Sequence, residues 1–189
     1  MFETDLQFGQ DPSARIVNPL QARQTAEARR RDIYDSHRHR VFSLAYYMTG
    51  NEIEAERILT GTFVRAFRAV PEPKGQDVDS ALIEEFRRRT YLQLNLVASP
   101  APCIDDLATF STGLAGRNVK RTELECAICC LPARERLLFL LRDVEGYTPA
   151  AIAQLLNLPE PEVQRCVFAA RIRLCQILAE GQPTKAEAA

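Results

Sequence analysis

Residues 145–178 read EGYTPAAIAQLLNLPEPEVQRCVFAARIRLCQIL, and this stretch predicts two helices joined by a tight turn. Thr148 is a suitable N-cap, and Pro149 follows it at the first helical position, where a missing amide proton costs little. Pro159 interrupts the apolar pattern, and a second helix with apolar residues at helical spacing starts near Pro161. This is the layout of a helix-turn-helix, whose second helix can enter a DNA major groove. Any two short amphipathic helices share much of the pattern, so plain packing is the alternative.

The composition is that of an ordinary globular chain. Of its 189 residues, 46% are hydrophobic and 26% charged, which suits one domain or two small ones. No apolar run is long enough to span a bilayer, and the N-terminus lacks the basic and apolar regions of a signal peptide. We therefore expect a cytoplasmic protein with no membrane partner. A formal net charge of -1 argues against DNA binding by bulk charge alone, so nucleic acid would be bound by local basic patches or with the help of a larger partner.

The cysteines do not form a recognisable metal site. Cys126 and Cys129 have the spacing of half a zinc site, but no second pair follows, and His37 and His39 lie far away in sequence. Cys126 and Cys130 also lie four residues apart on a predicted helix, which suits a buried apolar face. We therefore expect packing cysteines and no bound metal.

The rest of the chain predicts helices only, so the expected fold class is all-α, with two small helical domains. Residues 1–29 read as a loose extension, in which a short helix near residues 21–31 is the alternative. The first domain covers residues 30–97 and ends with a helix capped by Asp79 or Ser80, after a polar loop. Its predicted helices cover residues 30–48, 51–70 and 79–97.

A linker then joins this domain to the second one. Residues 98–121 lose the apolar period and are interrupted by Pro and Gly. The second domain covers residues 122–180 and contains the helix-turn-helix. Its run LLFLL, residues 137–141, has apolar side chains on every side of a helix and must be enclosed. Residues 181–189 form a frayed tail.

The chain contains no pattern typical of an enzyme. It has no Ser/His/Asp arrangement, no Gly-rich phosphate loop and no carboxylate pair with an acid/base context. We therefore expect no catalytic residue, no cofactor and no small-molecule substrate. One compact basic triplet, Arg87, Arg88 and Arg89, predicts either a solvated face or a ridge that contacts phosphates.

Two parts of the chain resemble bacterial RNA polymerase sigma factors of the extracytoplasmic-function group. Residues 131–164, LPARERLLFLLRDVEGYTPAAIAQLLNLPEPEVQ, and ARIRL at residues 170–174 are similar to the promoter-reading domain of that group. Residues 33–70, IYDSHRHRVFSLAYYMTGNEIEAERILTGTFVRAFRAV, are similar to its first conserved domain. Both halves occur in the order of the family, and the resemblance covers about residues 30–178.

The resemblance implies a subunit that binds core RNA polymerase and promoter DNA, is held by an anti-sigma regulator, and is not itself an enzyme. The helix at residues 52–70 would dock on the polymerase, and the candidates on it are Glu56, Arg57, Thr60, Phe63 and Arg65. The next helix would open the promoter, with the candidates Arg87, Arg88 and Arg89. The last helix would read the distal promoter element, with the candidates Gln164, Arg165, Phe168, Arg171 and Arg173.

Several residues depart from the family pattern. Arg57, Thr60 and Gly61 stand where the polymerase-docking helix usually carries acidic residues and Gln, and a glycine within a helix costs about 1 kcal/mol. Phe168 and Ala169 are expected on the DNA-facing side, which favours a protein groove over DNA. A second hypothesis therefore keeps the fold and changes the function. It is a sigma-like interaction protein that binds an anti-sigma or another regulator without initiating transcription.

Overall fold

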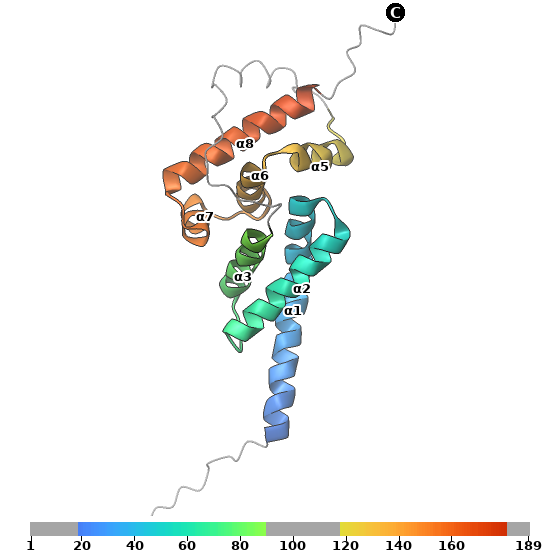
Figure 1. Ribbon diagram of the computed structural model, residues 1–189, viewed down its shortest axis with the longest axis vertical. Helices are drawn as coiled ribbons and strands as arrows, with labels where there is room; N and C mark the ends of the chain where they lie inside the picture. The colour runs from blue at the N-terminus through green and yellow to red at the C-terminus, as the bar shows by residue number, and fades with distance from the viewer. Residues whose placement is uncertain (1–18, 90–117, 181–189) are drawn as a thin grey trace, which may run out of the picture.

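The computed structural model describes residues 19–89 and 118–180, and every regular element in these ranges is helical (Figure 1). The all-α prediction is confirmed. The N-terminal helices are α1 (Pro19–Thr49), α2 (Glu52–Ala69) and α3 (Gly75–Arg88). The C-terminal helices are α5 (Arg121–Cys130), α6 (Ala133–Phe139), the π-helical turn η2 (Leu140–Val144), α7 (Pro149–Leu156) and α8 (Glu160–Glu180). Among the described residues, no helix combines the length and apolar character needed to cross a membrane.

The first helix is longer than the sequence predicts. It begins at Pro19 and runs for 31 residues, so residues 19–29 are helical and not part of a loose extension. Proline suits this start, because its ring presets the helical φ and the first turn needs no amide partner. In Figure 1 the first half of α1 projects away from the other helices, whereas Val41 and Met48 in its second half are buried.

Two capping residues, Gly50 and Asn51, separate α1 from α2. Gly50 has a φ of 66°, which a residue with a side chain rarely adopts, and it ends α1. The side chain of Asn51 then accepts hydrogen bonds from two backbone N–H groups of the first turn, at 2.9 and 3.2 Å. These bonds satisfy amides that have no partner inside the helix. The predicted start of a helix near residue 51 is confirmed.

The start of α3 lies earlier than predicted. The helix begins at Gly75, where a polar loop was expected, because Asp77 accepts a hydrogen bond from the backbone N–H of Lys74 at 2.8 Å. A carboxylate in the first turn also interacts favourably with the helix dipole. Asp79, the expected cap, lies inside the helix instead and is buried.

The apolar core is continuous between the two groups of helices. Leu137, Leu138, Leu140 and Leu141 are each at most 2% exposed, so the predicted enclosure of this run is confirmed. They belong to one cluster that also includes the buried residues of α1, α2 and α3. The end of α1 contacts α5 and α6, and α3 contacts α7. Most of the predicted linker, residues 98–117, lies outside the described residues.

One half-buried guanidinium contacts the ends of two helices at this junction. Arg136 of α6 donates hydrogen bonds to the carbonyl oxygens of Met48 and Tyr47 at 2.9 and 3.3 Å. It also donates to the carbonyl oxygens of Cys129 and Leu131, the latter at 2.8 Å. These carbonyls lie at the ends of α1 and α5, where the helix itself offers no donor.

The helix-turn-helix is formed by α7 and α8. Thr148 caps α7 by accepting a hydrogen bond from the backbone N–H of Ala151 at 3.2 Å, and Pro149 is the first helical residue. Asn157, with a φ of 54°, ends α7 in the left-handed conformation, and α8 begins at Glu160. The predicted motif is confirmed.

Candidate functional site

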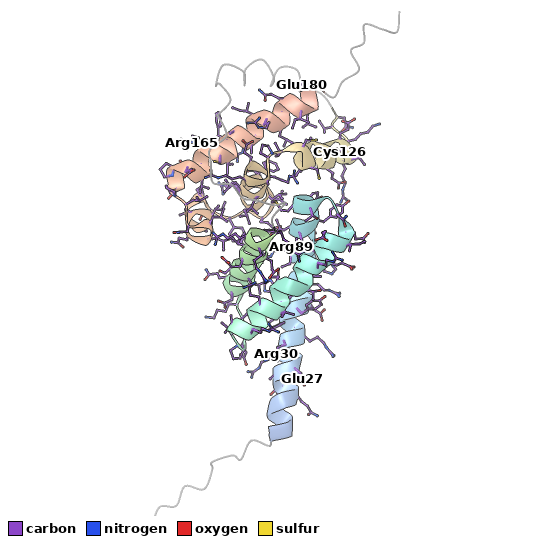
Figure 2. The ribbon with its side chains drawn as sticks, viewed as in Figure 1. Glu27, Arg30, Arg89, Cys126, Arg165 and Glu180 are labelled. Atoms are coloured by element: carbon purple, nitrogen blue, oxygen red, sulfur yellow. The ribbon has the colours of Figure 1, made fainter. Side chains whose placement is uncertain are left out.

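The predicted DNA-reading residues of α8 divide into exposed and ion-paired side chains. Gln164 and Arg165 are exposed in the first part of the helix, and Arg165 has no ion-pair partner among the described residues. Arg171 pairs with Asp143 of η2 at 2.9 Å, and Arg173 pairs with the buried Glu135 of α6 at 2.8 Å. The structure therefore separates Arg165 from the two arginines that hold α8 to its neighbours. Figure 2 shows Arg165 near the start of α8, away from Glu180 at its end.

The two apolar residues expected on the DNA-facing side of α8 differ from each other. Phe168 is 39% exposed, as expected. Ala169 is 6% exposed, so its predicted exposure is wrong. Consecutive residues of a helix point about 100° apart, and the core begins one residue after Phe168. Of these two residues, Phe168 is therefore the one that can contact DNA or a protein partner.

The basic triplet of α3 does not form one ridge. Arg87 pairs with Glu84 at 2.6 Å and donates to the carbonyl oxygen of Leu156 at 3.0 Å, at the end of α7. It therefore connects the N-terminal helices to the helix-turn-helix. Arg88 and Arg89 turn instead toward α2, where they line a groove. Figure 2 shows Arg89 at the centre of the molecule.

A buried carboxylate orders that groove between α2 and α3. Glu85 accepts a hydrogen bond from Arg65 of α2 at 3.0 Å and another from Arg88, one turn along α3, at 3.4 Å. Arg89 reaches Glu54 of α2 at 2.9 Å. The side chain of Glu85 is 7% exposed, so its charge is kept from water and depends on these arginines.

A polar cluster of Arg40, Asp79, Tyr147 and Glu145 connects α1 and α3 to the turn before α7. Arg40 donates to a carboxylate oxygen of Asp79 and, at 2.9 Å, to the hydroxyl of Tyr147. The Tyr147 hydroxyl donates in turn to the other oxygen of Asp79, and Glu145 lies 3.8 Å from Arg40. Burial and the hydrogen bond to Asp79 raise the pKa of Tyr147 to about 12. Burial also raises the pKa of Glu145.

Comparison with known proteins finds a family match in the C-terminal helices and a similar protein over most of the chain. Residues 121–174, which span α5 to most of α8, match the family described as Sigma-70, region 4. Over 171 residues the chain is 24% identical to the ECF RNA polymerase sigma factor SigE of Mycolicibacterium smegmatis, and the alignment covers 84% of this chain. The chain is thus similar to one extracytoplasmic-function sigma factor over most of its length, and the region-4 family match lies in its C-terminal helices. It spans 65% of the length of SigE.

The predicted polymerase-docking residues of this sigma-factor relative lie on different faces of α2. Glu56, Arg57 and Thr60 are exposed, and Arg57 pairs with Glu54 of its own helix at 2.6 Å. Phe63 is 4% exposed and stacks edge-to-face on Tyr34 of α1, with ring centroids 4.8 Å apart. Phe63 is therefore part of the core, and its side chain is not exposed for a partner in this structure.

The cysteines also depart from their prediction. Cys126 and Cys130 are exposed on α5 rather than buried on an apolar face, whereas Cys166 is buried in α8. Burial raises the pKa of the Cys166 thiol, which keeps it protonated. Cys103 lies outside the described residues. Within residues 19–89 and 118–180, no cluster of three or more His, Cys, Asp or Glu side chains could hold a metal ion.

Sequence reasoning missed the residues that organise both clusters. Gly61 was the one available signal, since a glycine in the middle of a helix needs a reason. A Cβ at this position would lie 2.8 Å from the Glu85 carboxylate, closer than van der Waals contact allows. Gly61 therefore leaves space for the buried Glu85. No local pattern predicts the contacts of Arg40, Asp79 and Tyr147, because they come from three distant segments.

Proposed function

We propose that this chain is a sigma factor that binds core RNA polymerase and directs it to promoters, where transcription begins. The observation that carries the proposal is the helix-turn-helix of α7 and α8 inside the region-4 match, with Gln164 and Arg165 exposed at the start of its second helix. The N-terminal residues of such a helix are those that reach base edges in a major groove. An arginine binds guanine or phosphate, and a glutamine binds adenine.

The partners follow from this role. They are core RNA polymerase, promoter DNA and an anti-sigma regulator, with the polymerase supplying the catalysis and the cytoplasm as the site of action. We further propose residues 30–97 and 122–180 as the domains that contact the proximal and distal promoter elements. Contacts between these two groups of helices would then have to open when both elements are bound.

The arginines of α8 can be ordered as candidate DNA contacts by the ion pair that each would lose on binding DNA. Arg165 comes first because it gives up no ion pair to reach DNA. Arg171 is half exposed, and its pair with Asp143 could be exchanged for a phosphate at small cost. Arg173 faces the buried Glu135, and its removal would leave that carboxylate without its counter-charge, so we propose a structural role for it.

The candidate docking surface on α2 is reduced to its exposed residues. Glu56, Arg57 and Thr60 are available to the polymerase, whereas Phe63 is not. The alternative function, a sigma-like protein that binds a regulator without initiating transcription, is favoured by Phe168, whose exposed ring suits a protein groove better than DNA. Arg57 favours it too, because it stands where the family usually carries an acid.

A transcription assay with purified core polymerase and fragments of the source genome tests the proposal. Wild-type protein should direct initiation from specific fragments, and Arg165→Ala should weaken it at promoters that depend on the distal element. Arg121→Ala is the matched control, since it removes an exposed, ion-paired arginine from α5. If no fragment is ever transcribed and Phe168→Ala abolishes capture of a regulator, the interaction protein replaces the sigma factor.

A further inference from the structure

The groove between α2 and α3 concentrates positive charge in a chain whose net charge is -1. Four of its lining residues are arginines, Arg65 and Arg68 from α2 and Arg88 and Arg89 at the end of α3, and its volume is about 860 Å³. Glu85 is the one acidic residue of the lining. Four guanidiniums thus surround one carboxylate, which leaves an excess of positive charge.

The arginines of the groove are unequally neutralised. Glu85 is shared by Arg65 and Arg88, at 3.0 and 3.4 Å, and the side chain of Arg88 is 66% exposed. Arg89 has its own partner outside the lining, Glu54. Arg68 is exposed and has no ion-pair partner among the residues that the structure describes. Arg68 and Arg88 are therefore the two guanidiniums that can turn to a ligand without stranding a buried charge.

We propose that this groove binds a ligand that carries two or more phosphate groups, held by Arg68 and Arg88 and flanked by Arg65 and Arg89. A guanidinium presents paired N–H donors that match the oxygens of a phosphate. Two of the arginines are already oriented by Glu85 and Glu54, which lowers the entropy lost on binding. The lining offers only Val64 and Ala69 as apolar residues, so an acidic protein helix would find few anchors there.

The phosphates have two sources, the backbone of a single nucleic-acid strand and a small polyphosphate. The strand deepens the proposed function, on which this part of the inference rests, since an opened promoter supplies one. It reassigns Arg65 from the polymerase-docking surface to the groove and adds Arg68 to the predicted contacts Arg88 and Arg89. Arg87 leaves this set because it binds α7.

Fluorescence anisotropy with the full chain tests the site, using a labelled short oligodeoxythymidylate at low salt and inorganic tripolyphosphate as competitor. Arg68→Ala and Arg88→Ala should each weaken binding of the oligonucleotide several-fold. Each should also reduce the slope of log K against log salt by about 0.7, the value for one phosphate contact to a single strand. Arg38→Ala is the matched control, because Arg38 is an exposed arginine paired with an acid three residues away, as Arg88 is, but lies outside the groove.

The two sources give different results. Oligonucleotide binding that depends on Arg68 and resists tripolyphosphate supports the strand, and displacement at equal phosphate concentration supports the small ligand. Absence of binding to either probe, or an equal loss in Arg38→Ala, overturns the site. Binding of a polyglutamate peptide, but of neither phosphate probe, through Arg68 would assign the groove to an acidic protein partner and also overturns it.

The same variants separate this inference from the proposed function. If Arg68→Ala/Arg88→Ala protein initiates transcription and binds the oligonucleotide like wild type, the groove is wrong and the sigma factor stands. If wild type never initiates transcription but binds the oligonucleotide through these residues, the sigma factor is wrong and the groove stands.

Discussion

The arginines of α8 and those of the groove between α2 and α3 are held in different ways. On α8, Arg171 and Arg173 each have a carboxylate of their own, Asp143 and Glu135, on a neighbouring element. In the groove, Glu85 serves two guanidiniums. The number of arginines on a helix therefore says little about the charge that the helix offers to a ligand. What counts is how many carboxylates lie within reach.

This difference also gives the two regions different proposed roles, reading of the DNA sequence for α8 and affinity for phosphates for the groove. The helix-turn-helix keeps a small exposed reading surface, chiefly Gln164 and Arg165, because its other cations stabilise the packing of α8. The groove keeps excess charge and would supply affinity for phosphates without reading a sequence. Under the proposed function, sequence discrimination then depends on α8, and binding strength depends on the groove.

The largest effect is expected from Leu140→Asp, which tests whether the two regions are energetically separate. Leu140 is 0% exposed, and an unpaired buried charge costs on the order of 4 kcal/mol or more, a large part of the stability of a small domain. We expect α5, α6, α7 and α8 to lose hydrogen-exchange protection, while α2 and α3 keep theirs. Exchange measured by mass spectrometry on peptides from both regions gives the result.

Val144→Asp is the control for this change. Val144 lies in the same π-helical turn but is 55% exposed, so the same substitution should shift stability by no more than about 0.5 kcal/mol. Loss of protection in α2 and α3 together with the C-terminal helices would show that the continuous core makes both regions one folding unit. A Leu140→Asp protein that melts like wild type would contradict the core assignment itself.

The sequence predicted the parts of the fold that depend on neighbouring residues. The helix-turn-helix, the helix that starts near residue 51 and the enclosed run at residues 137–141 all follow from spacing and capping within one segment. Phe63 shows that the spacing of apolar residues is a better guide to burial than the likeness to a family. It belongs to the apolar stripe of α2, which predicts burial, and only the likeness to a docking helix placed it on a partner surface.

The candidate sites were less predictable because their contacts join distant segments. Arg87, Arg88 and Arg89 are consecutive, so on a helix they must point in different directions, and this much was available from the sequence. Which of them meets α7 and which meets α2 depends on packing between helices. The relation of Gly61 to Glu85 is of the same kind, since the two residues come from different helices.

A smaller effect is expected at Gly61, and it tests whether Glu85 is the centre of the groove. Replacing glycine by alanine within a helix normally adds about 1 kcal/mol of stability. Here the new Cβ would lie 2.8 Å from the Glu85 carboxylate and displace it from Arg65, so Gly61→Ala should give no gain or a loss. In a Glu85→Ala background the normal gain should return.

A double-mutant cycle by urea unfolding measures this coupling, which we expect to be about 1–2 kcal/mol. Gly61→Ala effects of the same size in both backgrounds would mean that Glu85 moves aside freely. The groove would then lack a fixed carboxylate that two arginines share, which is the feature that distinguishes it from α8.

The smallest effect is expected from Tyr147→Phe, which tests the polar tie between the two regions. Near pH 8 the variant should be less stable by about 1 kcal/mol, the usual net value of one hydrogen bond, because Asp79 loses a donor. The pKa of Tyr147 is raised to about 12 in the folded protein, against about 10 in an unfolded chain. Between these values the unfolded chain releases the phenolic proton and the folded protein keeps it, so wild-type stability falls as pH rises through this range. The stability gap between wild type and variant, measured by urea unfolding, should therefore close from about pH 10 to pH 12. A gap that stays constant over this range would mean that the Tyr147 hydroxyl does not donate to Asp79 and that this hydrogen bond does not help to hold the two groups of helices together.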